Sequence, residues 1–429
     1  MKNKKRFSLY GLIIIFGLCI IFFASDVSAY TLRFIGEYER TELSDSLINP
    51  ENILERPTDR VESVIVYERA DDLWSGHLVI NFRGSYLYLD GPYSLSHHSA
   101  FRGKFNELYY QRDFGNISVT LGRKRVRWGV GYASSPTDLI TQLRTADDPD
   151  DRLQRIQGTE IFQLSAISSD SQFDIVYFPE LTENQRGWDV DNGWDRYEQT
   201  RFAVRYYRYI DPFDLSIVGK VEQRDQWAAG LNSSVTVGDA LELHAEYLFT
   251  YRNDTLYPVQ FVFPTFLYST KDNNVHDVLV GGQYTFNHDW NLTLEYIFRS
   301  AGYSETEWNE LTDHITFVNN NLALLRSQSL FGLEDAASVA TGVQRQHHMF
   351  ARLYKPDILP SLSFEWYGFA SLEDWSGLQT LHTEYSVSDL YNLYLRIEHF
   401  WGHSTSEFGL VPDEVKGIIG FSMFFGSEE

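Results

Sequence analysis

The segment LELHAEYLF, residues 241–249, decides the interpretation of the whole chain because apolar and polar side chains alternate along it. In an extended strand, Leu241, Leu243 and Ala245 share one face, and Glu242 and His244 share the other. The same period of two returns in segments of about ten residues, the length that spans a bilayer as a tilted strand. The clearest further examples are 78–88, 213–222, 292–299 and 391–398. The chain is therefore predicted to be all-β.

Alternation alone fits both a soluble β-sandwich and a membrane β-barrel. Two further features favour the barrel. Tyr, Phe and Trp collect at the strand ends, as expected for aromatic girdles at two lipid interfaces, and the connections alternate between short and long. The predicted short links are 70–75, 114–115, 168–170, 210–211, 237–239, 287–288, 355–360 and 386–388. The predicted long links are 41–60, 90–104, 126–158, 180–198, 253–274, 302–344 and 402–412, and tight links at 225 and 374–375 stand where long ones are due.

This pattern predicts a transmembrane antiparallel up-and-down β-barrel with short periplasmic turns and long extracellular loops. We expect about 18 strands, with 16 as the acceptable alternative, and both chain ends on the rim with the short turns. Residues 30–429 form one barrel domain in this interpretation, and 415–425 is the closing strand. The long link near 318–340 is either a helix or a surface loop with a few packed leucines.

Residues 1–29 are predicted to be a signal peptide. Positive charges lie within 2–6, the run 9–24 is almost wholly apolar, and 27–29 has the small residues that a signal peptidase accepts. The alternative is an uncleaved inner-membrane anchor, and the small residues favour cleavage near Ala29. Export to the cell outer membrane is the expected result. The single cysteine, Cys19, lies within this segment, so thiol nucleophiles and disulfide scaffolds are excluded from the exported chain.

Charge and motifs narrow the function further. A formal net charge of −23 argues against nucleic acid as a partner. No G-x-S-x-G motif is present, so we expect no enzyme activity and no cofactor. The histidine pairs 97–98 and 347–348 are candidate metal ligands. His399 and His403 have a helical ligand spacing at a strand end, where it does not converge, and no metal site is expected overall.

The stretch NISVTLGRKRVRWGVGYASSPTDL, residues 116–139, carries the predicted selectivity site. An alternating strand runs into a cluster of positive charge, and the same long connection ends in a cluster of negative charge. Opposed charges across a narrow space would filter ions. The predicted constriction residues are Arg123, Lys124, Arg125, Arg127, Asp147, Asp148, Asp150 and Asp151. Ser135-Pro136-Thr137-Asp138 has a capping-box pattern with proline at the first helical position, which predicts a short helix through 139–144.

The register of the basic run poses a problem. Alternation continued from Leu121 would point Arg123, Arg125 and Arg127 toward lipid, at a cost of roughly 2 to 4 kcal/mol for a charge near the midplane. Our hypothesis is a bulge at Gly122 that turns the arginines into the lumen. Wall charges at Arg83, Lys220 and Arg396 would support them there. The alternative is that the arginines pair with the acidic cluster and only pin the loop.

The basic stretch also resembles a known signature. Gly122-Arg123-Lys124-Arg125, Trp128-Gly129, Gly131 and Ser135-Pro136-Thr137-Asp138-Leu139 are similar to the Gly-Arg-Gln-Arg, Trp-Gly and Asn-Pro-x-Asp-Leu elements of porin-like outer-membrane proteins. The alginate-export family, an 18-stranded anion-conducting barrel, shares the Gly-Arg-Gln part. Lys124 replaces Gln and Ser135 replaces Asn. The resemblance implies a channel of the outer membrane.

The sequence thus predicts a porin that passes small polar or anionic solutes passively, constricted by an inward-folded third loop. The alternative is a structural barrel that sheathes or anchors a secreted or electron-transfer partner, and co-purification in mild detergent would distinguish the two. Expected partners are outer-membrane lipid and lipopolysaccharide, small solutes, and the barrel-assembly machinery through the C-terminal strand. Assembly as a homo-oligomer stays open.

Overall fold

A computed structural model gives the fold. It describes residues 30–52, 56–71, 76–90, 98–141, 148–181, 197–222, 226–252, 255–271, 274–340 and 344–427. The predicted signal peptide and Asp147 lie outside these residues.

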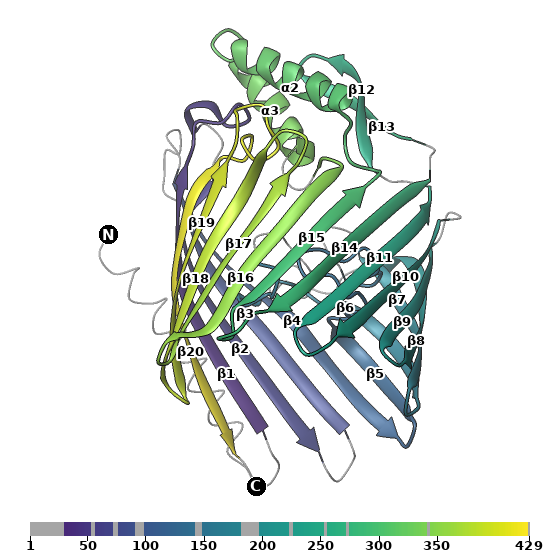
Figure 1. Ribbon diagram of the computed structural model, residues 1–429. Helices are drawn as coiled ribbons and strands as arrows, with labels where there is room; N and C mark the ends of the chain where they lie inside the picture. The colour runs from purple at the N-terminus through teal and green to yellow at the C-terminus, as the bar shows by residue number, and fades with distance from the viewer. Residues whose placement is uncertain are drawn as a thin grey trace.

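Eighteen antiparallel strands form one closed sheet, as predicted (Figure 1). The first strand pairs with the last, with Tyr30 opposite Ser427, so both described ends lie on the same rim. The first eleven strands are β1 (Tyr30–Leu43), β2 (Arg56–Asp71), β3 (Gly76–Asp90), β4 (His98–Phe114), β5 (Ile117–Lys124), β6 (Thr159–Ile167), β7 (Ser171–Leu181), β8 (Tyr197–Ile210), β9 (Phe213–Glu222), β10 (Trp227–Val237) and β11 (Leu241–Tyr251). The other seven are β14 (Val275–Thr285), β15 (Asn291–Arg299), β16 (His347–Leu359), β17 (Leu362–Ser371), β18 (Ser376–Ser388), β19 (Tyr391–Trp401) and β20 (Asp413–Ser427).

Short turns occupy the rim that holds both ends of the sheet, and the longer connections occupy the other rim, as the sequence predicts. The tight links β9–β10 and β17–β18 fall where they were expected. The connection after β11 carries a hairpin that the sequence did not reveal, β12 (Leu256–Val262) with β13 (Thr265–Thr270). A short 3-10 helix, Pro50–Asn52, lies between β1 and β2.

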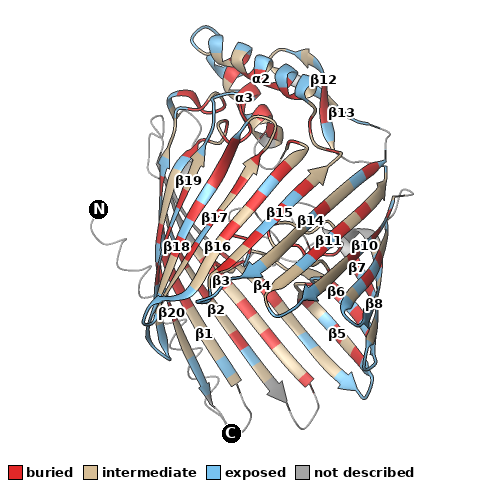
Figure 2. Cartoon of the chain, viewed as in Figure 1, coloured by how far each residue is buried: buried red, intermediate tan, exposed pale blue. Residues whose placement is uncertain are grey.

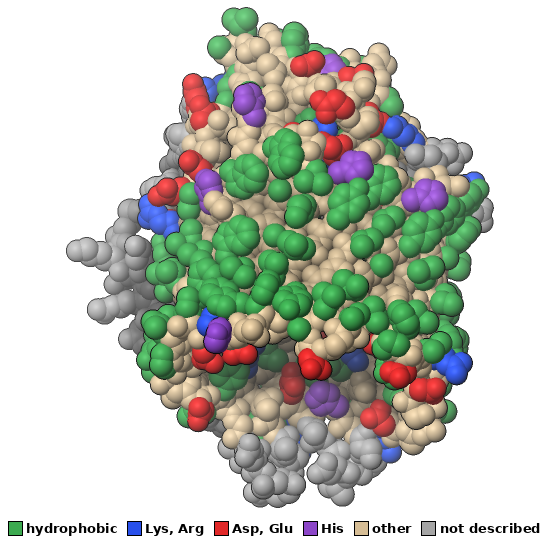
Figure 3. Space-filling model, in the orientation of Figure 1, with side chains coloured by type: hydrophobic (Ala, Val, Ile, Leu, Met, Phe, Trp, Pro, Cys, Tyr) green, Lys and Arg blue, Asp and Glu red, His purple; other side chains and the backbone are tan. Residues whose placement is uncertain are grey.

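The alternation seen in the sequence separates the two faces of the wall. On β19, Leu393 is 52% exposed, whereas Arg396 on the opposite face is 1% exposed. Buried and exposed residues alternate in this way along most strands (Figure 2), and the apolar side chains form a belt with acidic groups above and below it (Figure 3). An apolar outer face and a polar inner face are the arrangement of a barrel in a bilayer. The chain is therefore a transmembrane β-barrel.

Two helices cover part of the long-loop rim (Figure 1): α2 (Glu305–Asn320) and α3 (Arg326–Ala340). Ser304 caps α2 in a capping box: its hydroxyl oxygen accepts from the backbone N–H of Glu307, and its own backbone N–H donates to the Glu307 carboxylate at 2.9 Å. Trp308, Leu311 and Ile315 of α2 pack with Leu333 of α3 into a buried apolar cluster. Helix is thus the correct alternative for 326–340. Neither helix in the described residues is long and apolar enough to cross a membrane.

Candidate functional site

The basic run leaves β5 through Gly122, which has a φ of +122°. A Cβ atom here would lie 2.3 Å from the carbonyl oxygen of Leu108, so only glycine fits. The predicted bulge at Gly122 is wrong, because the register runs unbroken through it in both neighbouring ladders. The irregularity lies in β4, where Asn81 pairs with Glu107 and Phe82 with Phe105, leaving Asn106 unpaired.

The four basic side chains have different surroundings. Arg123 is 4% exposed, pairs with Glu160 of β6 and donates to the carbonyl of Phe105 at 3.0 Å. Lys124 Nζ donates to Gln111 Oε1 at 3.0 Å. These two therefore belong to the wall.

Arg125 and Arg127 lie in the connection between β5 and β6, residues 125–158, which is called the connection from here on. Arg125 donates to Glu107 Oε2 at 2.5 Å and forms an ion pair with Asp151. Arg127 is exposed and has no ion-pair partner among the described residues. Its neighbours Val126 and Trp128 are buried against the inner faces of β6 to β11. Arg127 therefore projects away from the wall.

Glu246 of β11, the buried carboxylate in the segment 241–249, binds the connection at several points. Its Oε1 accepts hydrogen bonds from the backbone N–H groups of Val130 at 2.7 Å and Gly131 at 2.6 Å. Its Oε2 accepts from the backbone N–H of Thr137 at 2.9 Å and its hydroxyl at 2.7 Å. The Ser135 hydroxyl donates as well, at 2.9 Å. The connection wraps around a wall carboxylate much as a backbone nest binds an anion.

The predicted helix through 139–144 is wrong over the residues that are described, up to 141. A turn at 136–137 stands where this helix was expected to begin, and the contacts with Glu246 explain the difference. The Ser135 hydroxyl donates to Glu246 rather than accepting from the backbone as a helix cap would. The Asp138 carboxylate accepts from the backbone N–H groups of Trp128 at 2.6 Å and Gly129 at 2.8 Å. The polar groups that would start a helix are thus used in tertiary contacts.

A second wall carboxylate, Glu295 of β15, continues the attachment. It accepts hydrogen bonds from the backbone N–H groups of Tyr132 and Ala133, the latter at 2.8 Å. Its third partner is His244 Nε2 of β11, at 2.8 Å. The connection that starts at β5 is therefore fixed to strands on another side of the barrel.

The acidic end of the connection is also bound to the wall. Asp148 lies 3.1 Å from Arg396 of β19, and Asp151 accepts from the backbone N–H of Arg155 at 2.6 Å. Arg155 in turn lies 2.6 Å from Glu39 of β1. Burial raises the pKa of Asp151 to about 6, against the opposing effect of Arg125.

Asp150 links the connection to β16 and β17. It accepts from the Tyr132 hydroxyl at 2.5 Å and lies 3.1 Å from Arg152. Arg152 also lies 2.7 Å from Glu365 of β17, which pairs with Arg352 of β16. Charged groups on strands all around the barrel, from β1 to β19, thus hold the connection.

The predicted wall charges all have partners: Arg83 pairs with Glu62, Lys220 with Glu222, and Arg396 with Glu398 as well as Asp148. Among the residues that the structure describes, the basic run meets the acidic cluster through the ion pair of Arg125 with Asp151. Sequence reasoning missed Glu246, Glu295, Arg152 and Arg155 as the attachment points. For Glu246 and Glu295, the sequence offered one signal that could have identified them: each is an acidic side chain on the polar, inward face of an alternating strand.

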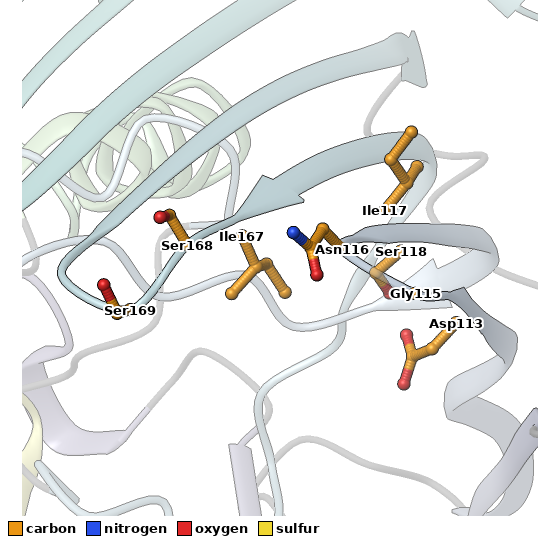
Figure 4. Close-up of a pocket in the computed structure, with 8 residues that line it drawn as sticks. All are labelled: Asp113, Gly115, Asn116, Ile117, Ser118, Ile167, Ser168 and Ser169. Carbon is orange, nitrogen blue, oxygen red and sulfur yellow. The ribbon is translucent and has the colours of Figure 1, made fainter.

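Two other features of the described residues have no direct part in this site. No three His, Cys, Asp or Glu side chains among them gather so that they could hold a metal ion. A cavity of about 500 Å³ lies between the β4–β5 and β6–β7 turns, lined by residues such as Asp113, Asn116 and Ser168 (Figure 4). It is a hollow of the short-turn rim.

No family model matches this chain, and no curated protein matches it either. Solved structures match over nearly the whole length. Acinetobacter baumannii OccAB1 is 11% identical with a TM-score of 0.54, and the alignment covers 94% of this chain and 97% of that one. Pseudomonas aeruginosa OccK8 (OprE) and OccK5 (OpdH) are each 9% identical with TM-scores of 0.53 and 0.52, and each alignment covers 94% of this chain and 98% of the other.

At these identities the comparison shows a shared fold. The neighbours are outer-membrane porins, so they support the porin-like part of the resemblance and give no support to its alginate-export part. The chain thus has the 18-stranded barrel of outer-membrane porins.

Proposed function

We propose that this chain is an outer-membrane channel for the passive passage of small polar or anionic solutes. The lumen of a barrel of 18 strands is too wide to be filled by wall side chains alone, so the connection that occupies it sets the aperture. That connection, residues 125–158, is attached to Glu246, Glu295 and Arg396 on the inner wall. The constriction is the space that it leaves open.

The observation that carries the proposal is the position of Arg127. Its neighbours on both sides are buried against the wall, and its own side chain is exposed. Among the described residues of the connection, the other basic groups are compensated: Arg125 pairs with Asp151, Arg152 with Glu365 and Arg155 with Glu39. An exposed guanidinium beside a water path attracts anions and repels cations. Arg127 is therefore the proposed selectivity residue, with the paired charges acting as its support.

Reversal potentials in a planar bilayer under a salt gradient test this proposal. The wild-type channel is expected to favour anions, and Arg127→Glu is expected to shift the preference toward cations. Arg326→Glu makes the same charge change in α3 on the outer cap and should leave the potential unchanged. Zero conductance from folded protein would refute the channel. A strong cation preference that Arg127→Glu does not alter would refute the role of Arg127 in selectivity.

The closing strand supports a further part of the proposal. On β20, Ile419, Phe421 and Phe425 face outward and β1 pairs along its length. An aromatic, outward-facing terminal strand is the feature that we propose the barrel-assembly machinery recognises.

A further inference from the structure

Two connections of the long-loop rim meet above the lumen. The helices α2 and α3 arise between β15 and β16, whereas Ile48 belongs to the connection between β1 and β2. Four strands of the closed wall, β17 to β20, separate β16 from β1. Ile48 is nevertheless buried in one apolar cluster with Leu311 and Ile315 of α2. The helices therefore reach from one sector of the rim to another.

The α2 helix bridges the distance between these sectors. Its 16 residues extend for about 24 Å. At its first turn, Glu305 lies 2.6 Å from Arg345, which immediately precedes β16. At its last turn, the Asn319 side-chain amide donates to the backbone carbonyl of Leu47 at 3.3 Å. Because the wall of a closed barrel curves outward between β16 and β1, a straight helix that joins these points runs over the lumen. Figure 1 shows α2 lying across the top of the barrel.

The β12–β13 hairpin widens this cover. It arises between β11 and β14 and packs against both helices. Phe261 of β12 stacks on His314 of α2, with ring centroids 4.4 Å apart. At the hairpin tip, the carbonyl oxygen of Pro264 would lie 2.2 Å from a Cβ atom added at Gly332 of α3, so these two elements are in direct contact. The helices α2 and α3 and this hairpin together form the roof.

Buried charge holds the root of the roof, where the helices join the barrel. Arg345 is 1% exposed and lies between the Glu305 carboxylate and that of Glu373 in the β17–β18 link, the latter at 3.4 Å. The backbone N–H of Arg345 donates at 2.9 Å to Glu407, a buried carboxylate of the β19–β20 connection. Separating a buried charge from its partners is strongly unfavourable, because the charge is left without compensation. The root is therefore fixed to the rim.

The far end of α2 is held by a weaker kind of contact. The hydrogen bond from Asn319 to the backbone carbonyl of Leu47 joins two neutral groups, and Ile48 adds apolar surface. Water can replace a neutral hydrogen bond at little net cost, which it does not do for a buried ion pair. The contact with the β1–β2 connection therefore separates more readily than the root does.

We propose that the roof is a lid over the long-loop mouth, which pivots about its root and is held closed by Asn319 and Ile48. This inference deepens the channel function proposed above and rests on it, since the lid regulates by size which solutes reach Arg127. An element with a fixed root and a detachable end closes and opens as a hinged body. Small solutes pass beside the closed lid, whereas bulky solutes require its release.

Labelling of a cysteine in the connection tests the lid. The reporter is Arg127→Cys, because the only cysteine of the sequence, Cys19, lies in the predicted signal peptide. Two thiol reagents are added to cells that carry the barrel, a small charged methanethiosulfonate and a polyethylene glycol maleimide. Asn319→Ala in the reporter background is expected to speed the reaction of the bulky reagent several-fold and to leave that of the small one unchanged.

Asn320→Ala is the matched control, because Asn320 is exposed on the same turn of α2, and it should change neither rate. Ile48→Ala removes the apolar part of the contact and should act like Asn319→Ala, so the test does not depend on one variant. An unchanged rate for the bulky reagent in both release variants would overturn the lid. An equal rise for both reagents would also overturn it, because it would locate the change at the connection.

Bilayer recording of the same proteins separates the lid from the channel itself. Folded protein without conductance would refute the channel function. The ratio of the two labelling rates does not depend on conductance, so it decides in either case whether the roof opens.

Discussion

At the scale of single residues, the carboxylate of Glu246 organises the connection. A buried charge is costly unless hydrogen bonds satisfy it, and here three backbone N–H groups and two hydroxyls do so. The sequence shows the two partners separately, as a Gly- and Ser-rich stretch and as an acidic position on β11. Their meeting requires a separation of 109 residues between Thr137 and Glu246, which local sequence patterns do not report.

Replacing Glu246 tests this organisation. Glu246→Gln keeps the size of the side chain but removes the charge and one acceptor oxygen. Each buried donor left without a partner costs about 1–3 kcal/mol. Hydrogen exchange at the amides of Val130, Gly131 and Thr137 is expected to become roughly 5- to 150-fold faster. Glu242→Gln, on the same strand, is the control, and equal effects of both variants would argue against the clamp.

Asp151 should make the channel sensitive to pH. Its pKa is about 6 in the folded protein, above the ordinary value of 3.8, because burial disfavours the charge. Acidification from about pH 7 to about pH 5 therefore neutralises Asp151 and leaves Arg125 with less compensation. Reversal potentials should move toward anions over this range, and Asp151→Asn should remove that step. A step of the same size in the variant would contradict the assignment.

The raised pKa of Asp151 also determines how the free energy of unfolding changes with pH. Between about pH 4 and about pH 6 the folded state binds the Asp151 proton more tightly than the unfolded state does. This group therefore adds most to the free energy of unfolding at the acid end, and its contribution falls as the pH rises through about 6. Comparing urea unfolding of wild type and Asp151→Asn across this range measures it. A wild-type contribution that grows with rising pH would be the wrong sign.

At the scale of elements, the strands were predictable and the connections were less so. Strands reveal themselves because lipid on one face and water on the other impose a period of two over about ten residues. The sequence also contains the Ser304–Glu307 capping box of α2, although within this long connection a helix was predicted near 318–340 and not at 305–320. The β12–β13 hairpin packs against the helices and has no lipid-facing side, so no such period marks it.

The helical cap should unfold independently of the barrel. Trp308 is 3% exposed and its indole N–H donates to the carbonyl of Thr405 at 2.8 Å. Trp308→Ala is expected to cost the cap about 3–5 kcal/mol through the cavity it leaves. Hydrogen exchange should rise across 305–340 while the barrel strands keep their protection. Phe331→Ala, at a 60% exposed position on α3, is the control and should change little.

At the scale of the whole molecule, alternating connections and aromatic girdles predicted the closed 18-stranded sheet. The selectivity site was predictable only in part. The basic and acidic clusters are visible in the sequence, but which charges are paired depends on strands far away, such as β1 and β19. Arg127 differs from Arg123 and Arg125 only by what surrounds it in three dimensions.

Closure of the sheet makes a prediction for the intact protein. A barrel has no free strand edges, so it resists SDS until it is heated. Unheated protein is expected to migrate differently from boiled protein in gels. A chain that stays monomeric in water without detergent and shows no such difference would contradict the placement in the membrane.

Single-channel recording in a planar bilayer tests the central claim, that the attached connection sets the aperture of an otherwise wide lumen. Wild-type protein should give small, uniform conductance steps, and the double variant Glu246→Gln, Glu295→Gln should give larger or fluctuating ones. Folded barrels that give no steps, or identical steps from both proteins, would contradict the account.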